Sequence, residues 1–314
     1  MKGFFEHYQK HVKITTSNKC DFILQMSLEW STCNTELYLS QNRQIQRLIE
    51  KYNLIDSKQT FKTPMEAKLD LVSGSKDDLP DVPYAQLVCA LLFIARCTRP
   101  DILFSVTLLC RYLTNYTQPH FKAAMRILTY LKCTLNLKLV YRVTTTVKPL
   151  QIYIDSDWGG DKETGRSTSG GIIFLYGNPV AWFCQKQSDV SLSTSEAEYK
   201  TQTYAFKEGM YFINLIQSEM DIQLTPVETL IDNIGAAYMA EQVVTNKKTK
   251  HISLSYHYAR EQVQIFKNYY LTYVNTTLNC SDIFTKALDR GLFERHRNYI
   301  FKIEDEVGNN NNNN

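Results

Sequence analysis

The sequence predicts an α/β protein in which a mixed β-sheet covered by helices follows a mainly helical segment. Two kinds of periodicity predict this fold class. Apolar and polar residues alternate over 150–155, as in a strand with one buried face, whereas apolar positions recur with a helical period over 252–266. After residue 150 the expected elements follow the order β-β-β-α-β-α-α-β-α, which is typical of a sheet packed against helices.

The first half is expected to contain one hairpin and a run of helices. Pro100 and Pro119 stand where proline is favoured, in the first turn of a helix. The expected elements are a hairpin over 19–40, helices over 41–53, 84–97, 100–114 and 119–132, a polar loop over 71–82, a strand over 135–142 and a linker over 143–148.

The second half is expected to alternate between strands and helices. The turn over 177–179, Gly-Asn-Pro, predicts that the strands on either side of it are antiparallel. The expected strands cover 150–155, 170–176, 180–184, 227–232 and 269–274, and the expected helices cover 195–217, 234–242 and 251–266, with a last helix that begins near Ser281. The Asn-rich tail over 308–314 is expected to be disordered.

Length and composition indicate a soluble chain of about two domains. The eight cysteines form no C-x-x-C pair, and several lie in apolar helical stretches, so we expect reduced and mostly buried thiols of an intracellular protein. The start of the chain does not resemble a signal peptide, and the longest apolar run, 90–95, is too short to span a bilayer. We therefore expect no membrane partner.

The net charge of +3 combines an excess of Lys and Arg in residues 1–150 with an excess of Asp and Glu in residues 151–290. This asymmetry fits a first half that grips a polyanion and a second half that holds metal cations. It fits equally well two solvated faces that bind nothing, and charge alone leaves both interpretations open.

Four acidic residues, Asp155, Glu198, Asp232 and Asp282, stand where expected strands end or helices begin. Carboxylates without competing Cys or His ligands suit the hard cations Mg²⁺ and Mn²⁺. Two such ions about 4 Å apart are a common apparatus for cleaving a phosphodiester bond. The pattern predicts a metal site if the four side chains converge.

Each of the four also has a purely structural interpretation. Asp282 could be a first-turn acid favoured by the helix dipole, and Asp232 could belong to an ordinary strand-to-helix turn. Asp155 competes with Asp157 and Asp161 in the same segment. Taken together they favour a metal site, because gathered carboxylates repel one another unless a cation neutralises them.

Glu198 depends on how its helix begins. It follows Ser195 by three residues, so it could be the reciprocal partner of a capping box. Ser193 and Glu196 offer a second capping box two residues earlier, and that register would release Glu198 to point elsewhere.

Several motifs together resemble the ribonuclease H region of copia-type LTR retrotransposon polyproteins, of the yeast Ty-element kind. They are YIDSDWGGD (153–161), GRSTSG (165–170), STSEAEY (193–199), DN (232–233), TKHI (249–252) with YH (256–257), and SDIFTKAL (281–288). In the first half, YLSQ (38–41), TPME (63–66), TRPDI (98–102) and KAAMRILTYLK (122–132) resemble the end of a reverse transcriptase and the segment that joins it to ribonuclease H.

The resemblance implies a ribonuclease H-like mixed five-stranded sheet with flanking helices. It divides the chain into a truncated polymerase-palm remnant over 1–66, a thumb and connection segment over 67–148, a ribonuclease H domain over 149–300 and a disordered tail over 301–314. A location in the cytoplasm, in a virus-like particle if the element is active, or in the nucleus would follow.

Carried over by position, the resemblance assigns metal binding and catalysis to four carboxylates, with two Mg²⁺ or Mn²⁺ ions and no small-molecule cofactor. The expected activity is two-metal hydrolysis of the RNA strand of an RNA–DNA hybrid, and other products of the same polyprotein are further expected partners. The implied metal ligands are Asp155, Glu198, Asp232 and Asp282, and the implied nucleic-acid contacts are Lys247, Lys248, Lys250 and Arg166.

The chain departs from the family pattern in ways that leave an alternative function open. The apolar-flanked Asp-Asp motif of the polymerase is absent, since Asp77-Asp78 lies in a polar loop, and we expect no polymerase activity. Gly165, Ser253, Cys133 and Gly235 also depart from the usual residues. The alternative is a non-catalytic, pseudogene-derived remnant that at most binds nucleic acid, and a third reading is a structural subunit for a separate polymerase chain.

Overall fold

The computed structural model describes residues 20–75, 79–144, 147–220, 222–233, 235 and 257–303. The predicted helix over 234–242, apart from residue 235, lies outside the described residues, as do the predicted tail over 308–314 and three of the predicted nucleic-acid contacts: Lys247, Lys248 and Lys250.

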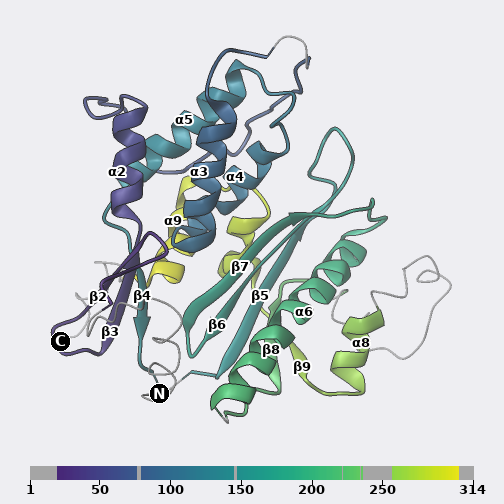
Figure 1. Cartoon of the computed structure of the whole chain (residues 1–314). Helices are drawn as coiled ribbons and strands as arrows, with labels where there is room; N and C mark the ends of the chain where they lie inside the picture. The colour runs from purple at the N-terminus through teal and green to yellow at the C-terminus, as the bar shows by residue number, and fades with distance from the viewer. Residues whose placement is uncertain are drawn as a thin grey trace, which may run out of the picture.

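A five-stranded mixed sheet forms the centre of the second half (Figure 1). Its strands are β5 (Leu150–Asp157), β6 (Thr168–Leu175), β7 (Asn178–Lys186), β8 (Val227–Ile231) and β9 (Tyr269–Tyr273), in the order β7-β6-β5-β8-β9. The first three strands are antiparallel neighbours, whereas β5, β8 and β9 run parallel. This strand order confirms the predicted ribonuclease H-like fold class.

One face of the sheet is covered by α6 (Thr194–Met220) and α8 (His257–Gln264) (Figure 1). The alternation along β5 directs Leu150, Ile152 and Ile154 into the core on this side, where Phe206 of α6 joins them.

The opposite face is covered by helices of the first half and by the end of the chain. They are α3 (Tyr84–Cys97), the 3-10 turn η1 (Pro100–Ile102), α4 (Leu103–Cys110), α5 (Gln118–Cys133), the 3-10 helix η5 (Cys280–Phe284) and α9 (Arg290–Phe301). Tyr153 and Phe174 of the sheet belong to the same core as Leu91 of α3 and Phe293 of α9. We call α3, α4 and α5 the connection helices. They share one hydrophobic core with the sheet.

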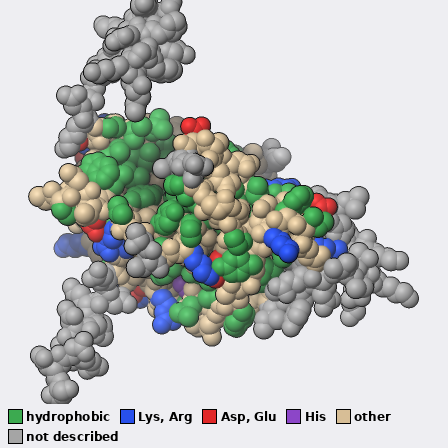
Figure 2. All heavy atoms as spheres, turned by 90° about the horizontal axis from the view of Figure 1, so that it is seen from below, with side chains coloured by type: hydrophobic (Ala, Val, Ile, Leu, Met, Phe, Trp, Pro, Cys, Tyr) green, Lys and Arg blue, Asp and Glu red, His purple; other side chains and the backbone are tan. Residues whose placement is uncertain are grey.

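A second, four-stranded sheet lies beside this body. It consists of β1 (Phe22–Ile23), β2 (Met26–Trp30), β3 (Glu36–Ser40) and β4 (Leu139–Arg142), all antiparallel, and α2 (Asn42–Lys51) directly follows β3. On the face of the molecule seen in Figure 2, Lys and Arg side chains are scattered and form no continuous stripe among the described residues.

Two expectations about helices need correction. The predicted helix over 100–114 is a 3-10 turn followed by the shorter α4. No α-helix begins near Ser281: η5 occupies that segment, and α9 begins only at Arg290 because Asp289 accepts hydrogen bonds from the amides of Gly291 and Leu292 as its N-cap.

The cysteines differ in part from expectation. All eight are free thiols, but only Cys280 is fully buried, because most of the others lie in loops, at element ends or on outer helix faces. Within the described residues, no helix combines the length and the apolar character that crossing a membrane requires.

Candidate metal centre

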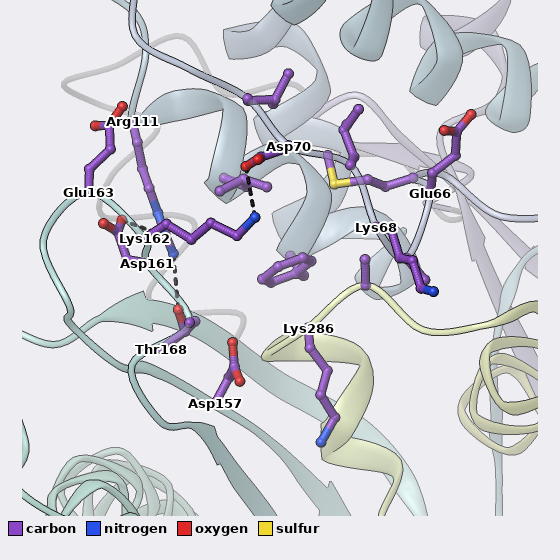
Figure 3. A pocket seen from close by; sticks show the side chains of 18 of the residues that line it. Glu66, Lys68, Asp70, Arg111, Asp157, Asp161, Lys162, Glu163, Thr168 and Lys286 are labelled. Carbon is purple, nitrogen blue, oxygen red and sulfur yellow. Dashed lines mark hydrogen bonds and ion pairs between the residues drawn. The ribbon is translucent and has the colours of Figure 1, made fainter.

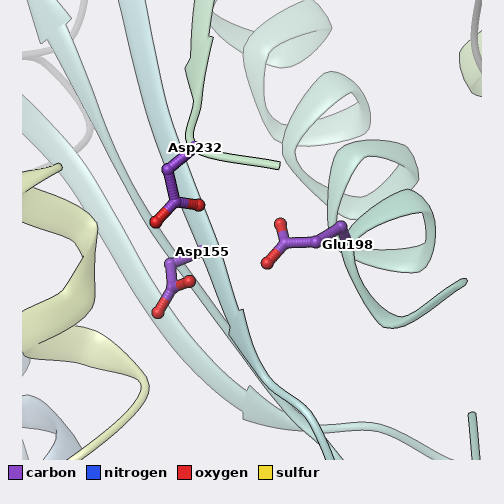
Figure 4. A group of neighbouring side chains, drawn as sticks. All are labelled: Asp155, Glu198 and Asp232. Atoms are coloured by element: carbon purple, nitrogen blue, oxygen red, sulfur yellow. The ribbon is translucent and has the colours of Figure 1, made fainter. Parts of the chain in front are cut away.

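Three of the four predicted carboxylates converge near the carboxyl ends of β5 and β8, two inner strands of the five-stranded sheet (Figure 4). Asp155 lies near the end of β5 and Asp232 directly follows β8, which runs parallel to β5. Glu198 reaches them from the first turns of α6. One carboxylate oxygen from each lies within 4.8 Å of the others. We call these three residues the carboxylate cluster.

Glu198 is available because its helix is capped in the earlier of the two registers. The hydroxyl of Ser193 accepts a hydrogen bond from the amide of Glu196 at 3.1 Å, and the carboxylate of Glu196 accepts one from the amide of Leu192 at 2.9 Å. Glu198 Oε1 instead accepts hydrogen bonds from the amide and the hydroxyl of Ser156, both at 3.0 Å. Its second oxygen, Oε2, is buried and has no hydrogen-bond partner within the described residues.

The carboxylates of the cluster repel one another in a buried environment. Burial, together with the charges of Asp155 and Asp232, raises the pKa of Glu198 well above its ordinary value. Burial and the charge of Asp155 also raise the pKa of Asp232. An all-oxygen donor set that repels itself, with one buried oxygen unpaired, fits a hard divalent cation.

Asp155 is held by the segment that packs on the other side of its strand. The hydroxyl of Thr285 donates a hydrogen bond to Asp155 Oδ2. Gly170 is the residue opposite Asp155 in the β5–β6 ladder, and a Cβ there would lie 2.7 Å from the Cβ of Phe284. The absence of a side chain at Gly170 therefore lets the end of η5 approach the sheet.

The fourth predicted ligand, Asp282, lies outside the carboxylate cluster but next to Asp155. It is buried on η5, which Asn279 ties to β5 by donating a hydrogen bond to the carbonyl of Ile154 at 2.9 Å. Burial and the charge of Asp155 raise the pKa of Asp282 to about 8. Its oxygen Oδ1 is 3.0 Å from the ammonium nitrogen of Lys286.

Sequence reasoning gave no role to Lys286, Thr285, Asn279 or Ser156, although each contacts a carboxylate or orients its segment. The i,i+4 spacing of Asp282 and Lys286 was the only available signal, since such pairs meet on a helical turn. The predicted nucleic-acid contact Arg166 lies in the partly exposed loop between β5 and β6, outside the carboxylate cluster.

Two cavities of about 510 Å³ each lie beside the carboxyl-terminal part of β5. The first is lined by the carboxylate cluster together with Trp158 and Tyr273, whose side chains are 50% and 57% exposed. Large aromatic side chains exposed beside a candidate active site are suited to contact a nucleotide.

The second cavity lies between the connection helices and the sheet (Figure 3). Several of its charges are already paired within the protein. Arg111 lies 3.0 Å from Asp161, and Lys162 lies 3.0 Å from Asp70. Asp157 and Lys286 also line this cavity, so it adjoins the Asp155–Asp282 pair.

Comparison with known proteins identifies relatives over most of the chain, although no family model matches. A retrovirus-related Pol polyprotein from transposon RE1 of Arabidopsis thaliana is 36% identical over 281 residues, which cover 88% of this chain and 19% of that protein. The Pol polyprotein from transposon TNT 1-94 of Nicotiana tabacum is 30% identical, with coverages of 87% and 21%. A transposon Ty5-1 protein of Saccharomyces cerevisiae is 32% identical over 192 residues, with coverages of 60% and 61%.

Solved structures with partial similarity are ribonuclease H domains. The N-terminal ribonuclease H domain of a Mycobacterium tuberculosis protein is 13% identical with a TM-score of 0.33, covering 47% of this chain and 95% of that chain. LC11-RNase H1, solved in complex with an RNA/DNA hybrid, is 14% identical with a TM-score of 0.32, covering 43% and 93%. The fold assignment rests on the strand order of the sheet rather than on these matches.

The chain spans about a fifth of the length of the polyproteins named first. Their sequence identity nevertheless extends through both the connection helices and the five-stranded sheet, which confirms the resemblance seen in the motifs. The chain is a homologue of the retrovirus-related Pol polyproteins of copia-type transposons and contains a region with the ribonuclease H-like fold.

Proposed function

We propose that this protein cleaves the RNA strand of RNA–DNA hybrids by metal-assisted hydrolysis. The observation that carries the proposal is the carboxylate cluster with its unpaired, buried Glu198 oxygen, placed at the end of parallel strands in a ribonuclease H-like sheet. Similarity to Pol polyproteins supports the same substrate class, because a retroelement passes through an RNA–DNA hybrid.

Asp155, Glu198 and Asp232 would hold one Mg²⁺ or Mn²⁺ ion, and Asp155 with Asp282 would hold a second. When bound, divalent ions help a water molecule to attack phosphorus and neutralise the charge on the departing 3′-oxygen. The first group of residues fits a cation on its own evidence, since its three carboxylates converge and Glu198 Oε2 has no hydrogen-bond partner within the described residues.

The protein's own side chains would orient this apparatus. Ser156 fixes the rotamer of Glu198 through two hydrogen bonds, so that Oε2 is left to face the site. Thr285 orients Asp155 by donating one hydrogen bond to its Oδ2. Trp158 and Tyr273 would contact a nucleotide in the first cavity, and discrimination of RNA from DNA would come from 2′-hydroxyl contacts.

Phosphate contacts would come from basic residues around the site, Arg166 among them. The proposed contact set also includes three lysines further along the sequence: Lys247, Lys248 and Lys250. Such contacts predict binding that weakens as the salt concentration rises.

A cleavage assay tests the proposal directly. The purified protein is incubated in Mg²⁺ with a hybrid whose RNA strand carries a 5′ label, and the wild type is compared with Asp155→Asn and with Asp289→Asn. Asp289 caps α9 at an exposed position, and asparagine caps helices equally well, so this control should cleave like the wild type.

RNA-strand products from the wild type and the control, but not from Asp155→Asn, are expected. Binding of the hybrid without cleavage by any variant would instead establish the non-catalytic alternative.

A further inference from the structure

The ammonium group of Lys286 lies between two carboxylates. Its nitrogen is 3.0 Å from Asp282 Oδ1 and 3.4 Å from Asp155 Oδ2. Asp155 also belongs to the carboxylate cluster, whereas Asp282 does not. The protein thus supplies its own positive charge to the Asp155–Asp282 pair, whereas Glu198 Oε2 has no hydrogen-bond partner in the described part of the chain.

The two carboxylates that contact Lys286 are the pair to which the proposed function assigns a second ion. An ammonium group and a divalent ion cannot both occupy the space between these oxygens, because they repel each other and need the same lone pairs. Within the described residues, the position between Asp155 and Asp282 is therefore already occupied by an ammonium group. The carboxylate cluster, which shares Asp155 with it, keeps one oxygen, Glu198 Oε2, without a hydrogen-bond partner.

Lys286 has space into which it can withdraw. Its side chain is 36% exposed, and it lines the second cavity together with Asp157 (Figure 3). Burial raises the pKa of Asp157, and the nearby charge of Lys286 opposes that rise. An ammonium that leaves Asp155 and Asp282 would thus meet another carboxylate along the same cavity.

We propose that Lys286 is a built-in counterion that holds the second-ion position. The resting protein binds one divalent ion at the carboxylate cluster, and a second ion enters between Asp155 and Asp282 only after Lys286 moves toward Asp157. This inference rests on the proposed function and adds a positioning residue that controls how many ions are bound.

Ion stoichiometry provides the test. Mn²⁺ is titrated into the metal-free full chain by calorimetry, and the bound ions are counted independently by electron paramagnetic resonance. The variants are Lys286→Met, which keeps the length of the side chain without its charge, and Lys148→Met as a matched control. Lys148 pairs with Glu228 at 2.6 Å near the opposite end of β5.

We expect one ion per chain for the wild type and Lys148→Met, and two for Lys286→Met. Two ions on the wild type, or one on Lys286→Met, would overturn the inference while leaving the proposed function intact, provided that the wild type cleaves the hybrid. No ion on the wild type together with no cleavage would overturn both.

Thermal unfolding provides a second test that also applies if Lys286→Met is less stable than the wild type. Loss of the ammonium leaves Asp155 and Asp282 to repel each other, so metal-free Lys286→Met should unfold on the order of 5 °C below the wild type. Mn²⁺ should raise its unfolding temperature by more than it raises that of the wild type. Equal metal-dependent shifts in the two proteins would contradict the inference.

Asp157→Asn tests the withdrawal step separately. The substitution removes the destination of the ammonium, so half-maximal cleavage should require several-fold more Mg²⁺. The same substitution in the Lys286→Met background should have no such effect, and an equal effect in both backgrounds would overturn the role of Asp157.

Discussion

At the scale of single residues, Glu198 presents the clearest conflict between stability and chemistry. Its side chain is 4% exposed, yet one carboxylate oxygen has no hydrogen-bond partner within the described residues. An unsatisfied buried polar group costs about 1–3 kcal/mol, and a charged one costs more. Under the proposed function this cost is retained because the same unpaired oxygen would bind a cation.

Glu198→Gln should therefore stabilise the metal-free protein. Glutamine removes one negative charge from the cluster, and its amide can donate to the neighbouring carboxylates. We expect an unfolding temperature a few degrees above that of the wild type in a chelating buffer, measured by calorimetry. Mg²⁺ should raise the unfolding temperature of the wild type but hardly that of the variant, and a metal-free variant less stable than the wild type would contradict this account.

The pH dependence follows from the direction of the pKa shift. Because the folded-state pKa of Glu198 is raised above the ordinary 4.5, the folded state holds the proton more tightly. Its contribution to stability is complete below pH 4.5 and is lost as the pH rises through the folded-state pKa. Asp282, with a pKa of about 8, acts in the same direction.

We therefore expect the difference in unfolding temperature between Glu198→Gln and the wild type to grow from pH 4.5 upward in metal-free buffer. His296 has a pKa lowered to about 4, mainly by burial, and it acts in the opposite direction. It is present in both proteins, so it cancels in the difference. A difference that stays constant between pH 4.5 and 8 would show that Glu198 does not titrate as described.

The motifs predicted Asp155 rather than Asp157, and Glu198 rather than Glu196, as metal ligands, and this assignment stays a prediction. The structure gives the physical reason for the second choice, since Glu196 is used in capping α6. The pairing of Lys286 with two carboxylates could not be predicted, because one of its partners lies 131 positions away in the sequence.

At the scale of elements, the contact between η5 and β6 decides where Asp155 and Asp282 meet. The helix expected over 84–97 is found there as α3. The last helix was placed wrongly because an acidic residue after a serine suggests a helix start, whereas Asn279 turns this segment into a 3-10 helix by accepting hydrogen bonds from the amide and hydroxyl of Ser281.

Gly170→Ala should disrupt this contact. The added Cβ would lie 2.7 Å from atoms of Phe284 and of Thr285, so the end of η5 must move away from Asp155. We expect a loss of about 1–3 kcal/mol in the free energy of unfolding, measured by denaturant titration, together with weaker cleavage.

Gly291→Ala is the control for this substitution. It lies in the first turn of α9, where the nearest atom to an added Cβ is 3.5 Å away, and alanine there should be neutral or slightly stabilising. Equal effects of the two substitutions would show that crowding at η5 is not the cause.

At the scale of the whole molecule, the connection helices and the sheet depend on each other. The indole of Trp182 in β7 donates a hydrogen bond to the carbonyl of Ala95 in α3 at 2.9 Å. Tyr130 of α5 packs edge-on against Phe293 of α9. The sequence suggested a boundary at 148/149 because composition changes there, but local composition does not reveal which faces share a core, and that boundary stays a prediction.

A fragment over 149–303 should consequently fold poorly. It lacks α3, α4 and α5, so the face of the sheet that carries Tyr153 and Phe174 would lose most of its cover. Exposed apolar surface of this kind favours association. We expect the fragment to bind a hydrophobic dye, to elute as aggregates in size-exclusion chromatography and to lack a cooperative thermal transition.

A fragment over 79–303 is the control for this prediction. It tests whether the loss of α3, α4 and α5, rather than truncation of the chain as such, prevents folding. It loses the β1–β3 strands and α2 but keeps the three helices that cover the sheet, so it should remain monomeric and unfold cooperatively. If the shorter fragment unfolded as cooperatively as this longer one, the core would divide at residue 149 after all. The connection helices would then serve only to position the substrate, and the carboxylate cluster would not depend on them for its geometry.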